Sequence, residues 1–241
     1  MGDVMTVVWK EIKEQGFRGG RRGKAGLIIF FGIFGVLFPL QWGTGWVTGL
    51  SGIILISWMP LLYASGVLAD AVAGERERHT LDTLLATRLP GTAILGGKLA
   101  AGVIIACMYS WIIAVSGLIV TNIAFWEGKL LLYPPAALTA IILFPVLTAG
   151  FAGGITVNFS IRAETAREAQ QFVSIGIIAL FLPFLIFNFL SPRIKEQVVS
   201  FLSGVSWETV PIIAALVLLA LDLLLFFGAG RHFNRENLSL E

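Results

Sequence analysis

The chain has 241 residues, of which 56% are hydrophobic and 13% are charged, and its mean hydropathy is +0.85. Soluble domains carry about a quarter of their residues as charged groups, so this composition excludes an ordinary soluble protein and indicates an integral membrane protein. The net charge of +2 is too small to suggest nucleic-acid binding, and no nucleic-acid partner is expected. The single cysteine, Cys107, excludes an intrachain disulfide and is interpreted as ordinary packing.

Residues 1–24 are expected to form a cytoplasmic helix in the membrane interface, followed by a basic linker. Lysines and glutamates alternate with apolar residues that recur at helical spacing, which is typical of amphipathic helices that contact membrane lipids. These apolar residues are Val4, Met5, Val8, Trp9 and Ile12. Anchoring to anionic headgroups alone and additional contact with a cytoplasmic partner both remain open. The glycines that follow should interrupt the helix: Gly16, Gly19, Gly20 and Gly23.

Residues 25–230 are expected to form one domain of six transmembrane helices. A helix needs about 20 apolar residues to cross the membrane, so a long stretch without charges predicts a span. The first such stretch is long enough for two spans, and each of the next three for one. These stretches lie between Lys24 and Asp70, Lys98 and Glu127, Lys129 and Arg162, and Glu168 and Arg193. A last span, 209–230, is interrupted only by Asp222. The predicted fold class is therefore an all-α integral membrane protein.

The distribution of basic residues predicts the orientation of these spans. Of the 17 basic residues, only Lys129, Arg193 and Lys195 fall in loops on one side of the membrane. The positive-inside rule therefore places both termini, including the tail 231–241, and the loop 69–98 in the cytoplasm of a cell (inner or plasma) membrane. The outer segment 191–208 is too short and too charged to cross, but it has an apolar side and is expected to dip into the outer leaflet.

Residues 69–98, ADAVAGERERHTLDTLLATRLPGTAILGGK, stand out because they are polar between two apolar spans. They hold eight of the 32 charged residues of the chain, which has 17 basic and 15 acidic residues. Leu81, Leu84 and Leu85 are spaced to share one side of a short cytoplasmic helix. A helix with one apolar and one charged side can dock against a partner.

The run AGERERHTLDTLLATRLP followed by ILGGK resembles the signature of ABC-2 type (type-2 ABC exporter) permeases. That signature reads AGER-E-x-GTLE-x-LL-x-TP, with a Gly-Lys a few residues later. His79 and Asp82 replace the usual Gly and Glu, and Arg88 separates Thr87 from the Leu-Pro that follows. In this family the loop is the coupling element that docks onto a separate ATP-hydrolysing subunit.

The resemblance implies an exporter permease subunit that lacks a nucleotide-binding domain and is not catalytic on its own. A second permease, identical or related, would complete the substrate pathway, while separate ABC ATPase subunits bind ATP and Mg. Short re-entrant helices close the outer end of the conduit in this family, and 191–208 fits that position. The implied ATPase-coupling residues are Glu75, Arg76, Glu77, Arg78, Thr80, Leu81, Asp82, Leu84, Leu85 and Thr87.

No cofactor or metal site is expected within the chain itself. The nearest approach to a phosphate-binding loop, 91–99, has the wrong spacing and lacks the Ser or Thr that should follow its lysine, Lys98. The two histidines, His79 and His232, have no cysteines or clustered carboxylates at ligand spacing. ATP is therefore expected to be handled by another subunit.

Asp222 is the one acidic residue well inside an expected span. A charge at the centre of a transmembrane helix costs on the order of 2.5–3.5 kcal/mol, so its carboxylate should have a role. It could face the helix bundle and hydrogen-bond to a neighbouring helix, or it could contact substrate or carry protons. A stand-alone channel or secondary transporter that uses Asp222 is the main alternative to the exporter, and a membrane scaffold is a further one.

Three smaller motifs concern helix packing. Gly49, Leu50, Ser51 and Gly52 match the Gly-x-Ser-Gly motif of intramembrane serine proteases, but both histidines are expected about a bilayer away from this serine, so the motif is interpreted as helix packing. Gly150 and Gly154 predict a close helix contact, within one subunit or in a dimer. Pro60 should kink the second span unless a neighbour satisfies the carbonyl that it frees.

Overall fold

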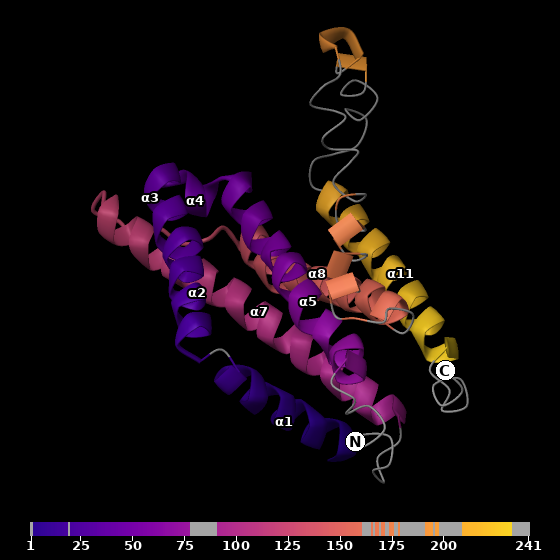
Figure 1. Cartoon of the computed structure of the whole chain (residues 1–241). Helices are drawn as coiled ribbons and strands as arrows, with labels where there is room; N and C mark the ends of the chain where they lie inside the picture. The colour runs from indigo at the N-terminus through magenta and orange to yellow at the C-terminus, as the bar shows by residue number, and fades with distance from the viewer. Residues whose placement is uncertain are drawn as a thin grey trace.

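A computed structural model describes residues 2–18, 20–77, 91–160 and 209–232, with short pieces between 165 and 197. All regular secondary structure in these residues is helical (Figure 1), which confirms the all-α prediction. Four stretches within these helices are long and apolar enough to cross a membrane: Lys24–Trp42, Gly96–Ala124, Pro135–Thr156 and Pro211–Gly228. They match the first, third, fourth and last expected spans. The second expected span contains a shorter apolar helix, Leu50–Ala64, and the fifth, about residues 172–190, lies mostly outside the described residues.

The described helices follow one another along the chain with few long connections. They are α1 (Gly2–Arg18), α2 (Gly20–Gly32), the π-helix η1 (Ile33–Leu37), α3 (Phe38–Trp42), α4 (Gly45–Thr48), α5 (Leu50–Glu77), α7 (Gly91–Ala124), α8 (Pro135–Ser160) and α11 (Thr209–His232). The expected glycine-rich linker after α1 is short, because α2 already begins at Gly20. The glycine-containing segment 20–24 therefore belongs to the first membrane helix.

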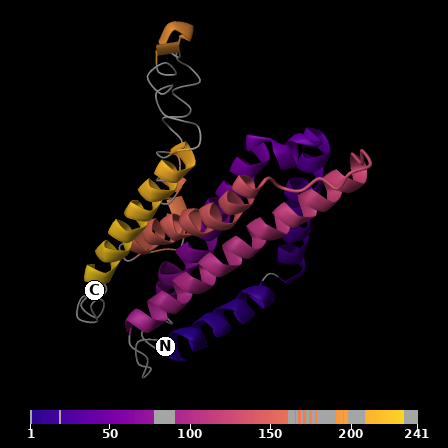
Figure 2. The ribbon, with the colours of Figure 1, turned by 180° about the vertical axis from the view of Figure 1, so that it is seen from behind.

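The centre of the molecule is formed by α5, α7 and α8, which pack against one another. Viewed from both sides, α2 and α3 lie at one flank of this group and α11 lies at the other (Figures 1 and 2). One buried cluster includes Leu61, Cys107 and Ala152, and a second includes Trp46, Ile56 and Ile113. The position of Cys107 confirms its interpretation as a packing residue.

α5 and α7 are the longest of the described helices. The 28 residues of α5 and the 34 residues of α7 give lengths of about 42 and 51 Å, against about 30 Å for the hydrocarbon core. The sequence predicts a loop over 69–98, but 69–77 and 91–98 are helical turns that extend α5 and α7. Alanine and glutamate in 69–77 favour continued helix, so only 78–90 separates the two helices.

Pro60 lies inside α5 and cannot donate the backbone hydrogen bond that the carbonyl of Ile56 would normally accept. The hydroxyl of Ser110 on α7 donates to that carbonyl instead, and Ser110 is fully buried. Of the two outcomes expected at Pro60, a kink or a neighbour that satisfies the freed carbonyl, the structure therefore shows the second.

Pro145 creates the same situation inside α8, where it frees the carbonyl of Ile141. The indole Nε1 of Trp111, also on α7, donates to this oxygen at 3.0 Å. Ser110 and Trp111 are consecutive residues, so one turn of α7 supplies the missing donors for both proline-containing helices.

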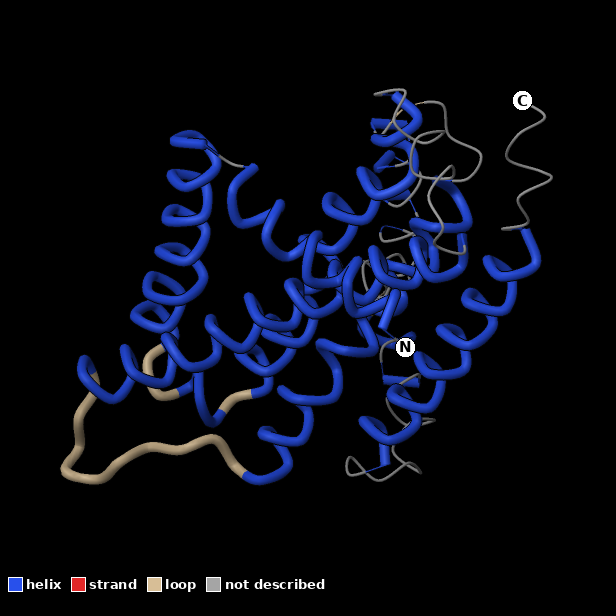
Figure 3. Tube along the Cα trace, turned by 90° about the horizontal axis from the view of Figure 1, so that it is seen from below, coloured by secondary structure: helices blue, strands red, loops and turns tan. Residues whose placement is uncertain are grey.

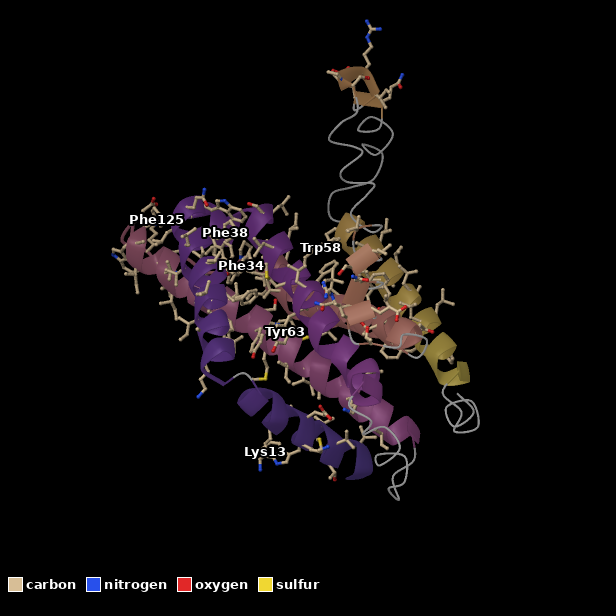
Figure 4. All side chains as sticks on the ribbon, in the orientation of Figure 1. Lys13, Phe34, Phe38, Trp58, Tyr63 and Phe125 are labelled. Carbon is tan, nitrogen blue, oxygen red and sulfur yellow. The ribbon has the colours of Figure 1, made fainter. Side chains whose placement is uncertain are left out.

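The turn between α3 and α5 is built from glycines and tryptophans. Gly43 has a φ of +57°, a left-handed conformation that favours glycine. The rings of Trp42 and Trp46 lie 5.7 Å apart and end a ladder of aromatic rings that includes Phe34 and Phe38 (Figure 4). The sequence predicts both tryptophans in the outer aromatic belt, but Trp46 is fully buried. It packs inward because Gly117 of α7 leaves room for its indole.

The described connection between α7 and α8 is an extended loop (tan in Figure 3) that is fixed to α7. The side-chain amide of Asn122 bonds to both backbone groups of Leu131, with its Nδ2 2.9 Å from the carbonyl and its Oδ1 2.8 Å from the N–H. The Tyr133 hydroxyl donates to the carbonyl of Ala114 at 3.0 Å, and burial raises the pKa of Tyr133 to about 12. α8 then begins at Pro135, as the sequence predicts.

Candidate functional site

The predicted coupling residues lie at the end of α5 and in the segment after it. Glu75, Arg76 and Glu77 form the last turn of α5. The remaining ones lie outside the described residues: Arg78, Thr80, Leu81, Asp82, Leu84, Leu85 and Thr87. The short helix predicted around Leu81 therefore stays a prediction. The end of α5, the start of α7 and α1 all lie at the same end of the molecule (Figure 1).

α1 packs against the beginning of α7 (Figure 2). Val7 and Val8 are buried in this contact. A Cβ atom on Gly97 would lie 2.6 Å from the Cβ of Val7 and 3.2 Å from the carbonyl oxygen of Val4, so the glycine allows the two helices to approach closely. The Gly-Lys of the signature is therefore covered by the chain's own first helix.

A buried ion pair joins the same two helices. The Nζ of Lys98 lies 2.9 Å from Oε1 of Glu11, and the two residues are only 5% and 4% exposed. A charge buried this far depends strongly on its partner, because neither group can return to water while the helices stay packed. Sequence reasoning missed this pair. The available signal was a glutamate on the apolar side of the amphipathic helix, three and four residues after Val8 and Val7.

The opposite side of α1 is exposed and partly apolar. Met5 is 69% exposed and Trp9 is 63% exposed, and the Lys13 ammonium lies 5.4 Å from the centre of the Trp9 ring. These three residues recur every four positions and form one stripe, with Lys13 on the side of α1 away from the bundle (Figure 4). The apolar residues predicted to face the membrane are thus divided between α7 and this stripe.

Asp222 lies on α11 and faces α8. The residue is 6% exposed, and a Cβ atom on Gly150 would lie 3.0 Å from its Oδ2. Along the same contact, a Cβ on Gly154 would lie 2.7 Å from the Cβ of Leu225, and the Asn158 amide donates to the Leu225 carbonyl at 3.0 Å. The two glycines therefore serve packing within one chain, which was one of the two uses expected of them.

The hydrogen bond from Asp222 to a neighbouring helix, one of the uses expected of it, is not found among the described residues. Its Oδ1 atom is buried and has no hydrogen-bond partner. Among the described residues, no group of three histidine, cysteine, aspartate or glutamate side chains could hold a metal ion. Asp222 therefore faces the bundle as predicted, but as a carboxyl group with an unsatisfied oxygen.

Comparisons with known proteins identify no relative of this chain. No family model matches it, and neither the curated proteins nor the solved structures include a match. The motif in 69–98 and the helices that hold it are therefore the basis for assigning a function.

Proposed function

We propose that this chain is the permease subunit of an ABC exporter of the ABC-2 type. It has six transmembrane helices and two cytoplasmic termini, and it forms a substrate pathway with a second permease, either another copy or a related chain. Separate ATPase subunits bind ATP and Mg. The observation that carries the proposal is the signature-like motif, held between two helices that are each longer than a membrane span.

The lengths of α5 and α7 support a coupling role for the residues between them. Glu75, Arg76 and Glu77 belong to a helix that continues into the membrane, and only residues 78–90 separate that helix from α7. A helix moves as a unit, so a force on Glu75, Arg76 or Glu77 is transmitted along α5.

The docking of α1 gives further support. It braces the start of α7 through the buried pair of Glu11 and Lys98 and covers the Gly-Lys of the motif, so the proposed contact with the ATPase falls to the residues that precede this Gly-Lys. Glu75 and Glu77 would pair with basic groups on the ATPase, while Leu81, Leu84 and Leu85 fill an apolar groove there.

The mechanism is the transmission of a movement. ATP binding brings the two ATPase subunits together, the segment 75–87 moves with them, and the helices rock between inward-facing and outward-facing arrangements. Such coupling between binding sites is reciprocal, so a transported substrate also changes the affinity of the ATPases for ATP.

Co-purification with the candidate ATPase encoded next to this chain tests the proposal. The double change Glu75→Arg and Leu84→Asp should abolish the association, because removal of a charge partner and an anchoring leucine costs a few kcal/mol of docking energy. The matched control is Glu127→Arg with Leu130→Asp, which makes the same chemical changes in the connection between α7 and α8 and should leave the complex intact. ATP hydrolysis of each purified complex gives a second readout.

Two results would contradict the exporter assignment: no ATPase associates with the folded wild-type chain, or the Glu75→Arg and Leu84→Asp chain binds as well as the wild type. Either result would favour the alternative, a stand-alone channel or secondary transporter that uses Asp222.

A further inference from the structure

The carboxyl group of Asp222 is buried between α8 and α11 without a complete set of partners. The residue is 94% buried, since it is 6% exposed, and its Oδ1 has no hydrogen-bond partner. Its Oδ2 faces the backbone of α8 at Gly150, where no side chain intervenes. The glycines of α8 therefore form a seam with α11 into which the Asp222 carboxyl group is directed, two turns from the Asn158 amide that bonds to α11.

Among the described residues, no ion pair balances an ionised Asp222. α8 (Pro135–Ser160) contains no ionisable residue, and the described part of α11 has only Arg231 and His232 besides Asp222. Arg231 is nine residues, or 2.5 helical turns, further along α11. The residues expected to form the fifth span lie between Glu168 and Arg193 and carry no charge.

Burial without a counter-charge favours the neutral form of a carboxyl group. Moving an isolated carboxylate into a low-dielectric interior costs so much that the group takes up a proton instead. Within a membrane, water is not available to solvate the charge unless the helices separate. The packing of Asp222 against Gly150 therefore suits a carboxylic acid and opposes a carboxylate.

We propose that Asp222 is a proton-binding site in the seam between α8 and α11. In the closed seam the carboxyl group holds a proton taken from water, and when the helices part and water enters, the proton returns to water and leaves the carboxylate. The ligand is the proton, and the conformations of the two helices are linked to its binding. This inference does not depend on the assignment as an exporter.

Infrared spectroscopy of the full-length protein in lipid nanodiscs tests the proposal. At pH 7 an exposed aspartate, with a pKa of about 3.9, is ionised, so a carbonyl stretch of a protonated carboxyl group should come from a buried acid. We expect this band in the wild type, its loss in Asp222→Asn and its retention in the control Glu127→Gln, which removes an exposed acid. The absence of the band at pH 7, or its persistence in Asp222→Asn, would overturn the proposal.

Two further measurements keep the test decisive. If Asp222→Asn does not fold, isotope labelling replaces it. The other aspartates are changed to asparagine (Asp3→Asn, Asp70→Asn and Asp82→Asn), so that ¹³C-labelled aspartate enters only at position 222. The band of the protonated carboxyl group must then shift. Gly150→Leu should wedge the seam open, admit water and weaken the band at pH 7. If the band does not shift in the ¹³C-labelled protein, it does not come from Asp222. If the band is unchanged in the folded Gly150→Leu protein, the proton is not linked to the packing of α8 against α11. Either result would contradict the proposal.

Discussion

Trp46 can pack against α7 only because Gly117 has no side chain. Trp46 has no exposed surface, and a methyl group on Gly117 would overlap its indole ring. The tryptophan belongs to the outer turn and the glycine to α7, so this contact joins the first hairpin of the chain to the central helices.

Gly117→Ala is therefore expected to destabilise the protein. The indole must move out of a fully packed site, and overpacking of this kind costs about 1–3 kcal/mol. Thermal unfolding in detergent measures the effect. Gly96→Ala is the matched control on the same helix, because nothing lies within 4 Å of the Cβ that it would add. Alanine loses less backbone entropy than glycine on folding, so this variant should be as stable as the wild type or slightly more stable. Equal stability of the two variants would show that Trp46 does not need this gap.

Among the helices, α7 has a special position because it completes both of its proline-containing neighbours. Ser110 donates a hydrogen bond to the carbonyl freed by Pro60 in α5, and Trp111 donates one to the carbonyl freed by Pro145 in α8. A carbonyl left unsatisfied away from water costs more than an ordinary hydrogen bond contributes. These two contacts therefore satisfy the freed carbonyls and join α7 to both neighbours.

The bond from Trp111 can be tested with its proline. Trp111→Phe keeps the ring but removes the donor to Ile141, and should lower the free energy of unfolding by about 1–3 kcal/mol. Pro145→Ala restores a backbone N–H for that same carbonyl, so the double variant should lose much less stability than Trp111→Phe alone. Thermal unfolding of the wild type, the two single variants and the double variant gives the four stabilities of a double-mutant cycle. Trp126→Phe, at a residue that is 60% exposed, is the control and should have little effect. Additive losses in the double variant would contradict the role of the indole N–H.

At the scale of the whole molecule, α1 is held on the bundle by a buried ion pair and by close packing at Gly97. Glu11→Leu leaves Lys98 buried without a partner and should destabilise the docked state by about 3–5 kcal/mol. Hydrogen exchange of the α1 backbone should then become faster.

The second change Lys98→Met removes the stranded charge and should restore most of the protection of α1, because an apolar pair of similar size can replace a buried ion pair. Lys13→Met, on the exposed side of the same helix, is the control and should leave the exchange of α1 unchanged. Fast exchange in the double variant, or no change in Glu11→Leu, would show that the pair does not hold α1 in place.

Much of the fold could be predicted from the sequence, because the membrane imposes a simple rule on the chain. Long gaps between charges located the spans that begin near Lys24, Leu99, Pro135 and Thr209, and Pro135 marked the start of α8 as prolines often do in a first helical turn. From Pro60 alone, the sequence also predicted that this helix has a freed carbonyl, which a donor from a neighbouring helix could satisfy.

The identity of each partner was not predictable in the same way. Ser110 and Trp111 are common residues in membrane helices, and only the packing of α7 between its neighbours brings them to the freed carbonyls. Asp222 was recognisable as an unusual acid, but its unsatisfied oxygen depends on the glycines of α8. For the coupling segment, the sequence predicted the motif and a short helix, and the part of that segment in 78–90 lies outside the described residues.

The pair of Glu11 and Lys98 also bears on how the protein is made. The two residues are 87 positions apart, so the ribosome completes the first helix long before its binding site exists. Until α7 has been synthesised, Glu11 lacks Lys98, its partner in the docked helix. Formation of this contact therefore requires α1 and the first turns of α7 to be present together.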